Sequence, residues 1–394
     1  MATASPDIVE KPRAIGIDRD IRVAWLFPSL ARGYYWQPVF KEFAARCPRT
    51  AVFTSIWPGF APGYENSFAI HTLPGLRYVD LKKRRPDARS GFSLTPLSIL
   101  KKLADFGPDV VFSAGFSGWT LCALLFRLLR GSRVIIFWEG CSEHALGSSK
   151  VKTALRRWIA HFADAAVSNA DEGTRYLRDV IGMPEHKLVC HPCQVPDLPL
   201  LCSGVVEANL PALKRPVFLF VGGLTGRKGW RYLIEASALL VAQGFQSFSV
   251  LFVGAGEQEE MRTAIRDHGL EGIVYQVGPV AYNNLGSYYA TADVFVSPTR
   301  QDTWGVAVLE AMAFGKPVLC SKYAGSRQMV THGDNGFIFD PSDTRQLARY
   351  MAKFIVEGCL AKQLGARSLE KMALFTPAHA ADVLANLVLQ AHQL

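Results

Sequence analysis

Two carboxylates, Asp302 and Glu310, stand with seven residues between them on either side of an expected helix start. The segment reads DTWGVAVLE, in which Gly305 makes a turn before an apolar helical stretch. A helix N-terminus presents free N–H groups and partial positive charge, so the backbone at Gly305 and Val306 suits a phosphate. The carboxylates would instead accept hydrogen bonds from hydroxyls. The segment therefore predicts a site for a sugar–diphosphate–nucleoside, although for either residue alone an Asp N-cap and a surface Glu are alternatives.

A second candidate phosphate contact is the basic turn at Arg227 and Lys228. Four glycines surround it: Gly222, Gly223, Gly226 and Gly229. Cations on such a turn can neutralise a diphosphate, and Arg can bind phosphate through two parallel hydrogen bonds. A solvated basic turn is the alternative, but the glycines favour phosphate binding.

Gly254 and Gly256 follow another apolar run, in the order Gly-Ala-Gly. The third glycine of a dinucleotide fingerprint is absent, so a nicotinamide site is not expected. We interpret the motif as a tight strand-to-helix turn that lines a cleft.

The first half of the chain offers Glu139, directly after the apolar run VIIFW, with His144 five residues later. A carboxylate at this position can orient or deprotonate a substrate hydroxyl, and a purely structural carboxylate is an equal alternative. Gly33 is expected to line the same side of the site. Three tryptophans lie in this half: Trp36, Trp57 and Trp119. Their rings can stack on a sugar, although core packing is the commoner fate of Trp.

Metal-ligating residues form no convincing cluster in the sequence. Asp18 and Asp20 precede the first strand instead of following it, so we expect no metal and no other cofactor. Cys190 and Cys193 form a CxxC motif that runs into a loop, and no second Cys or His pair has zinc-site spacing. They are interpreted as two thiols in an interdomain loop.

The elements that must hold these residues follow one plan in both halves: short, almost continuously apolar strands separated by helices. In the first half, strands are expected at 21–27, 51–57, 110–113, 134–138 and 165–168, and helices at 37–46, 118–129 and 150–162. In the second half, strands are expected at 217–221, 249–253, 273–277, 294–296 and 317–320, and helices at 230–243, 258–268 and 285–291. The pattern indicates βαβ units and parallel sheets covered on both faces.

A cluster of prolines at 196, 199, 211 and 216 marks a linker. We therefore expect an N-terminal domain, 1–205, and a C-terminal domain, 206–394, with the last helix a candidate to pack back on the first domain. Two such Rossmann-like domains place the ligand cleft between them, at the carboxyl ends of the strands.

The charge of the chain is unevenly distributed. Residues 1–205 carry 26 Lys and Arg against 18 Asp and Glu, whereas residues 206–394 carry 17 against 16. Basic groups gather at 82–85, 101–102 and 150–157. An anionic membrane surface, an anionic acceptor or a solvated face each account for this, whereas nucleic acid is not expected because no recognition motif accompanies the charge. Without a secretory signal or an apolar run of about 20 residues, a cytoplasmic location is expected, with peripheral membrane contact on the inner face as a hypothesis.

Taken together, six motifs over residues 217–345 resemble the donor-sugar domain of the retaining GT-B glycosyltransferases of family four. They are VGGL with Lys228-Gly229, VGAG at 253–256, Val277-Gly278, ADVFVSP at 292–298, the segment at 302–318, and Asn335-Gly336. The resemblance implies an α/β fold of the GT-B type, with two Rossmann-like doubly wound domains facing across a cleft. The first half resembles the family only in architecture.

The resemblance also assigns roles. Glu310 matches the family's ribose-binding Glu, and Asp302 stands where the family usually has a Glu that contacts the sugar hydroxyls. Lys228 matches a lysine that neutralises the leaving diphosphate together with an Arg five positions earlier. That position is Gly223 here, and Arg227 is the candidate replacement. The residues expected at the donor are Gly222, Gly223, Arg227, Lys228, Gly254, Gly256, Val277, Gly278, Asp302, Trp304, Gly305, Val306 and Glu310.

The expected activity is retaining transfer of a sugar from a UDP- or GDP-sugar to a hydroxyl of a saccharide or lipid-linked acceptor, in surface polysaccharide or glycolipid biosynthesis. Glu139, Lys228 and Asp302 are the candidate catalytic residues, and Gly33 and His144 are expected on the acceptor side. A nucleotide-sugar 2-epimerase of the same fold and a catalytically inactive sugar-nucleotide-binding protein are the alternatives.

Overall fold

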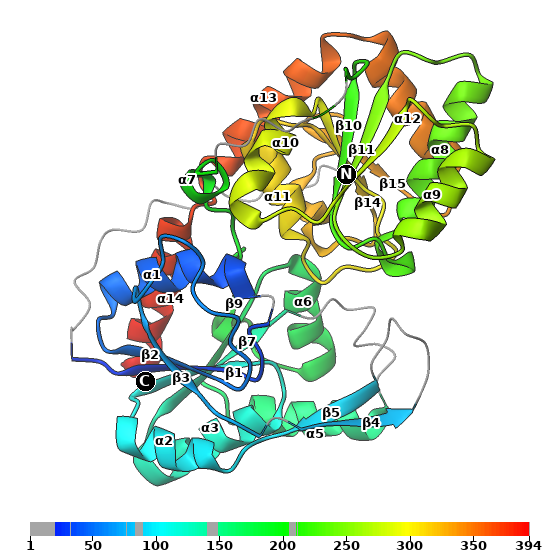
Figure 1. Ribbon diagram of the computed structural model, residues 1–394. Helices are drawn as coiled ribbons and strands as arrows, with labels where there is room; N and C mark the ends of the chain where they lie inside the picture. The colour runs from blue at the N-terminus through cyan, green and yellow to red at the C-terminus, as the bar shows by residue number, and fades with distance from the viewer. Residues whose placement is uncertain are drawn as a thin grey trace, which may run out of the picture.

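A computed structural model describes residues 20–31, 33–75, 77–82, 90–139, 149–204, 210 and 212–393. Two α/β units, each with its own parallel sheet, lie one above the other (Figure 1). Residues 205–209 lie outside the described residues, so the boundary at 205/206 stays a prediction.

The first sheet is parallel, in the order β3-β2-β1-β6-β7-β8-β9. Its strands are β1 (Val23–Phe27), β2 (Thr50–Thr54), β3 (Ala69–Thr72), β6 (Val110–Ala114), β7 (Arg133–Trp138), β8 (Ala165–Ser168) and β9 (Leu188–Cys190). Its helices are α1 (Gln37–Arg46), α2 (Ser98–Phe106), α3 (Gly118–Arg130), α5 (Lys150–His161), α6 (Asp171–Arg175) and α7 (Leu198–Leu201). β4 (Arg77–Lys82) and β5 (Ser90–Leu94) form a separate antiparallel pair.

The second sheet is parallel, in the order β12-β11-β10-β13-β14-β15. Its strands are β10 (Val217–Val221), β11 (Ser249–Val253), β12 (Val274–Gly278), β13 (Val294–Ser297), β14 (Val318–Ser321) and β15 (Gly336–Phe339). The helices are α8 (Trp230–Ala242), α9 (Gln258–Asp267), α10 (Leu285–Thr291), α11 (Val306–Ala313), α12 (Thr344–Val356), α13 (Leu360–Met372) and α14 (Pro377–His392).

Alternation along the strands explains why both faces of the first sheet are covered. Trp25 and Phe112 pack with α1 and α14 on one face, whereas Leu26 and Val111 pack with α2, α3 and α5 on the other. Because successive side chains of a strand point to opposite faces, a strand that is apolar throughout needs two helical layers. The strand and helix pattern read from the sequence is confirmed in these elements.

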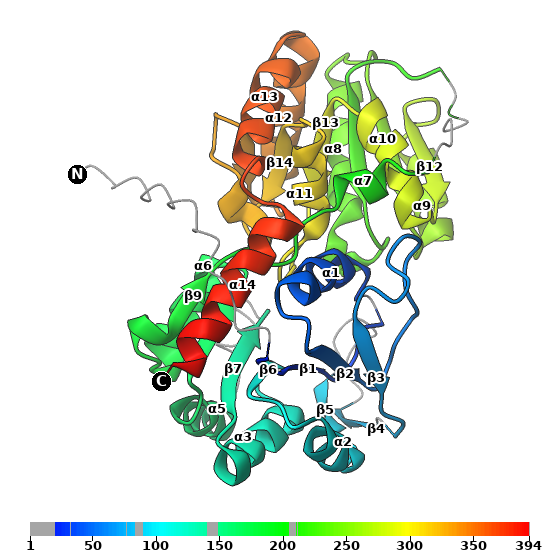
Figure 2. The same ribbon diagram turned by 90° about the vertical axis from the view of Figure 1, so that its left-hand side faces the viewer.

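The last helix, α14, leaves the second unit and packs against α1 and β7 of the first (Figures 1 and 2). Arg46 of α1 forms an ion pair with Asp382 of α14 at 2.5 Å. By length and composition alone, the helical run Leu360–His392 could cross a membrane. It comprises α13 and α14, however, and α14 buries a row of apolar residues, among them Leu384 and Val388, in the protein core.

Candidate functional site

Two adjoining cavities, of about 970 and 660 Å³, lie between the carboxyl ends of the two sheets. The larger is lined mainly by the first unit and is here named the acceptor-side cavity. The smaller is lined mainly by the second unit and is named the donor-side cavity. The residues that line both are Tyr35, Glu139, Gln194, Arg227, Lys228, Asp302 and Thr303. The three candidate catalytic residues therefore share one wall.

The start of α11 borders the donor-side cavity, and Gly305, its N-cap, has a φ of +90°. A Cβ at this position would lie 3.1 Å from Asp302 Oδ2 and from Ser326 Oγ. Glycine therefore lets the helix begin beside the Asp302 carboxylate, in a conformation that other residues rarely adopt. Asp302 itself is not the N-cap, so that alternative reading is wrong.

Glu310 lies in the second turn of α11 and lines the same cavity, with a relative exposure of 4 %. The alternative of a surface Glu is therefore also wrong. The Tyr289 hydroxyl donates a hydrogen bond of 2.5 Å to Glu310 Oε2. Burial raises the pKa of Glu310 to about 6, against the opposing effect of this hydrogen bond. Glu310 is therefore a hydrogen-bond acceptor, and its low-dielectric surroundings determine the pH at which it becomes charged.

The basic turn meets the first carboxylate of the motif on the wall between the cavities. Lys228 Nζ lies 2.5 Å from Asp302 Oδ2, and Arg227 Nη1 lies 3.7 Å from Asp302 Oδ1. Arg227 also donates to the Gln301 carbonyl at 2.7 Å. Two cations and one carboxylate, drawn from β10–α8 and β13–α11 loops, are thus gathered at one point.

The glycines of the second unit divide into two groups. Gly222 and Gly223 line the donor-side cavity, whereas Gly254, Gly256 and the pair Val277-Gly278 line neither cavity. A Cβ at Gly254 would lie 1.9 Å from the carbonyl oxygen of Gly222. The structure therefore gives Gly254 a packing role behind the Gly222 loop, rather than the cleft lining expected from the sequence.

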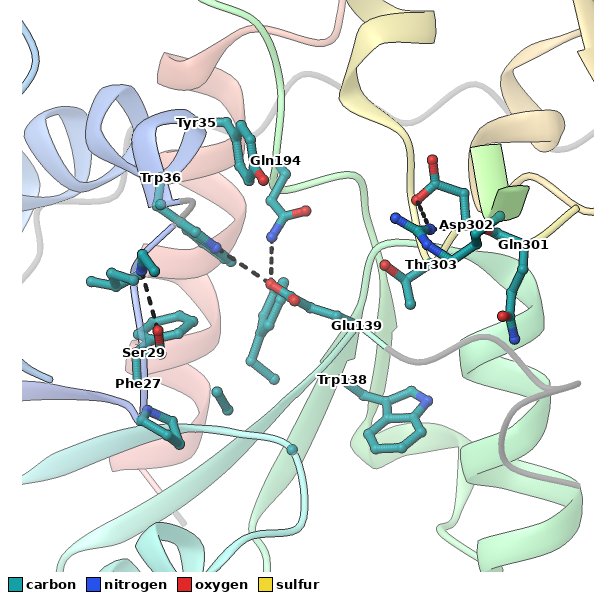
Figure 3. Close-up of a pocket in the computed structure, with 18 of the residues that line it drawn as sticks. Phe27, Ser29, Tyr35, Trp36, Trp138, Glu139, Gln194, Gln301, Asp302 and Thr303 are labelled. Carbon is teal, nitrogen blue, oxygen red and sulfur yellow. Dashed lines mark hydrogen bonds and ion pairs between the residues drawn. The ribbon is translucent and has the colours of Figure 1, made fainter. Parts of the chain in front are cut away.

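Glu139 follows β7 directly and lines both cavities. Its Oε1 accepts hydrogen bonds from Trp36 Nε1, at 3.3 Å, and from Gln194 Nε2 (Figure 3). Burial raises the pKa of Glu139, whereas the two hydrogen bonds lower it. Because both donors go to one oxygen, the carboxylate is fixed in orientation at the boundary between the cavities.

Gln194 also connects the two units, since its backbone carbonyl accepts a hydrogen bond of 2.9 Å from Trp304 Nε1. Trp304 is 2 % exposed and belongs to the Asp302–Glu310 motif. Trp304, which was expected at the donor, therefore also holds the interdomain loop through the Gln194 carbonyl. Because the Gln194 side chain hydrogen-bonds to Glu139, one residue links Trp304 to Glu139.

Sequence reasoning did not single out Gln194, because it belongs to no recognisable motif, whereas Tyr35 lies in the stretch from Tyr34 to Trp36 that was expected beside Gly33. Gly33 lines the acceptor-side cavity, and so does Trp36, although its ring is 2 % exposed. Trp119 is fully buried, and Trp57 packs against Phe60 and Phe68. His144 lies outside the described residues.

Comparisons with known proteins agree with this arrangement. The family model described as "Glycosyl transferases group 1" matches residues 206–371, and that described as "Glycosyltransferase Family 4" matches residues 37–196. The amylovoran biosynthesis glycosyltransferase AmsK of Erwinia amylovora is 31 % identical over 43 % of this chain and 44 % of its own length. The O-antigen chain mannosyltransferase B of Escherichia coli is 27 % identical, over 48 % and 50 %. The chain thus matches about half the length of these relatives.

Two solved structures illustrate the likeness in fold. HepE of Anabaena, solved in complex with UDP, gives a TM-score of 0.74 at 16 % identity and covers 94 % of this chain and 100 % of its own. Sucrose-phosphate synthase of Thermosynechococcus elongatus gives 0.70 at 18 % identity, with 94 % and 98 % covered. With a family match in each half and this architecture, the chain belongs to the GT-B glycosyltransferases of family 4.

Proposed function

We propose that the protein is a retaining glycosyltransferase that moves a sugar from a nucleoside diphosphate to a hydroxyl acceptor. One observation carries the proposal. A donor-side and an acceptor-side cavity adjoin, and their common wall holds two cations and two carboxylates, Asp302 and Glu139. Transfer between two substrates needs such a junction, because the reacting atoms of both must meet there.

The donor is proposed to bind along the second unit. The start of α11 and the Gly222-Gly223 loop would receive the diphosphate, and Glu310 would accept hydrogen bonds from the ribose. Asp302 would contact hydroxyls of the transferred sugar. The HepE structures contain UDP or UDP-glucose, which supports a uridine donor as the first candidate and leaves GDP as the second.

In the transfer step, the bond between the anomeric carbon and the diphosphate oxygen breaks, and a bond from the same carbon to the acceptor oxygen forms. The acceptor hydroxyl loses its proton, and Glu139 would orient that hydroxyl or receive the proton. Lys228 and Arg227 would stabilise the negative charge on the departing diphosphate, which is the main service that the protein offers this reaction. Arg227, close to Asp302, would thereby replace the Arg missing at Gly223.

The acceptor is proposed to be a saccharide or a lipid-linked saccharide. The relatives named for amylovoran and O-antigen synthesis support a pathway to a surface polysaccharide or glycolipid. We place the protein in the cytoplasm, in peripheral contact with an anionic membrane through its basic N-terminal half.

The experiment that tests the proposal is incubation with isotopically labelled UDP-, GDP- and ADP-sugars. Release of nucleoside diphosphate together with a glycosylated product supports it, and NMR of the anomeric proton should show the donor's configuration retained. An inverted product would refute the retaining mechanism.

The same panel separates the alternatives. Formation of an epimer without any acceptor would indicate a 2-epimerase, and binding without turnover would indicate an inactive sugar-nucleotide-binding protein. Asp302→Glu is the matched variant, because it restores the residue that the family usually carries. It should retain activity, and an Asp302→Ala variant should lose it.

A further inference from the structure

An exposed apolar stripe runs along α5 on the outer side of the first unit. It consists of Val151, Leu155, Trp158 and Phe162, at spacings of four, three and four residues. Val151 is 79 % exposed and Trp158 is 54 % exposed. A surface helix of a globular protein normally carries polar residues at these positions, because its apolar stripe faces the core. The stripe on α5 instead faces solvent.

The neighbouring helix α3 has the same unusual feature. Its exposed apolar residues are Leu121, Leu125, Leu128 and Leu129, of which Leu128 is 75 % exposed. The two helices pack against each other and against the same face of the first sheet, together with α2. Figures 1 and 2 both show this layer at the end of the molecule away from the second unit. We name the outward side of the two helices the α3/α5 surface.

The charge of this layer is strongly one-sided. The sequences of α2, α3 and α5 contain eight Lys and Arg and a single acidic residue, Asp105. Arg127 pairs with Asp164, and Arg156 lies over the Trp138 ring, so these two cations serve the fold. Arg130, Lys150 and Lys152 are exposed beside the leucines and the α5 stripe.

We propose that the α3/α5 surface docks on an anionic lipid bilayer, with Trp158 and the leucines in the headgroup–acyl boundary and the cations among the headgroups. An in-plane helix with an apolar face flanked by Lys and Arg binds such a boundary, and Trp is favoured there. A second copy of the chain is a poorer partner, because a two-fold contact would bring two basic surfaces together. The surface gives the membrane contact proposed above a definite location, and it does not depend on the transfer reaction.

The same surface connects to the site. On its inner side α5 holds Arg156 at 5.1 Å from the Trp138 ring, and Trp138 lines the acceptor-side cavity. A membrane-bound α5 would therefore be connected to the acceptor-side cavity through Arg156 and Trp138. This geometry suits an acceptor whose lipid anchor stays in the bilayer while its head group enters the cavity.

Vesicle flotation of the full chain tests the proposal. We expect binding to vesicles that contain phosphatidylglycerol, weaker binding to phosphatidylcholine alone, and loss of binding as salt rises from about 50 to about 500 mM. The variant Leu128→Ser/Leu155→Ser/Trp158→Ser should weaken binding about tenfold or more. Lys150→Glu/Lys152→Glu should act in the same direction.

Matched controls carry similarly exposed changes on the second unit: Val356→Ser/Leu369→Ser/Leu374→Ser for the apolar variant, and Arg349→Glu/Lys362→Glu for the charged one. Both should bind vesicles normally. Trp158→Phe should remove the blue shift of tryptophan fluorescence that vesicles cause, without loss of fold by circular dichroism.

Equal binding by the α3/α5 variants and their controls would overturn the proposal, and so would binding that does not depend on anionic lipid. A dimer in sedimentation velocity that the apolar variant dissociates would assign the surface to a second copy instead. The affinities of each variant for UDP, GDP and ADP are measured separately. If the parent protein binds none of the three, the proposed function is refuted, whereas the lipid surface still stands.

Discussion

The two cavities differ in the groups that line them. The donor-side wall includes a stretch of glycine backbone, at the helix start of Gly305 and in the Gly222-Gly223 loop, and Gly254 packs closely behind that loop. The acceptor-side wall includes a group of aromatic side chains, among them Trp36, whose ring stacks on Phe40 with 5.3 Å between centroids.

This difference has a physical consequence. A wall made of backbone requires glycines at fixed places, because no other residue permits the conformation or the approach. A wall made of side chains can be filled by many combinations of similar volume. The donor side should therefore respond sharply to single changes, and the acceptor side more gradually.

The largest expected effect comes from the donor side. Lys228→Ala should lower kcat/KM on the order of 10²–10³-fold, because it removes the cation that stabilises the leaving diphosphate. Lys362→Ala, at an exposed position of α13, is the control and should leave turnover unchanged. Steady-state rates with saturating acceptor measure both. A loss below about threefold would mean that Lys228 does not act on the leaving group.

The second effect concerns stability and tests whether the donor side requires glycine at a position where two backbone segments approach closely. Gly254→Ala should reduce the free energy of unfolding by about 3 kcal/mol, because its Cβ would meet the Gly222 carbonyl at 1.9 Å. Gly244→Ala is matched in having a positive φ, of +91°, but has nothing within 4 Å of the added Cβ. It should cost about 1 kcal/mol. Urea denaturation compares them, and equal losses would remove steric approach as the cause.

Glu310→Gln should weaken UDP binding by about tenfold while stabilising the fold at high pH. Burial raises the pKa of Glu310 to about 6 from the ordinary 4.5, so the native state binds more protons than the unfolded chain between these values. The unfolding free energy contributed by Glu310 is therefore highest below pH 4.5 and falls as pH rises through 6. The variant should gain about 1–2 kcal/mol over the parent at pH 8.

At pH 4.5 that gain should largely disappear, since Glu310 is then protonated in the parent as well. Urea denaturation at both pH values gives the stability, and calorimetric titration at pH 8 gives the UDP affinity. An equal gain at both pH values would show that the effect comes from packing and not from charge.

The smallest effect is expected on the acceptor side. Gln194→Ala removes a hydrogen bond that lowers the pKa of Glu139, so the acidic limb of the kcat/KM profile should move to higher pH with little change in the plateau. Gln328→Ala is the control, since Gln328 hydrogen-bonds across the two units to Asn169 and Asp171 without touching Glu139. A shift in both variants would point to domain placement instead.

The same contrast explains what could be predicted from the sequence. Strands β10, β11 and β13 were found to within a residue, because a central parallel strand is an uninterrupted apolar run. The edge strand β3 was missed, since its residues are exposed or half-buried and carry no such run. The donor motif was readable from its glycines and carboxylates. The contact of Gln194 with Trp304 and Glu139 was not, because it joins three segments far apart in the chain and leaves no local pattern.

The return of α14 to the first unit has a consequence for how the chain is made. Residues 377–392 leave the ribosome after the whole second unit, yet they complete the core around α1 and β7. The second unit, 217–372, holds its own sheet and helices and can fold while the first is still missing a helix. The two units would therefore complete folding against the usual N-to-C order, and we expect that ending the chain before Pro377 would unfold the acceptor half and spare the donor half.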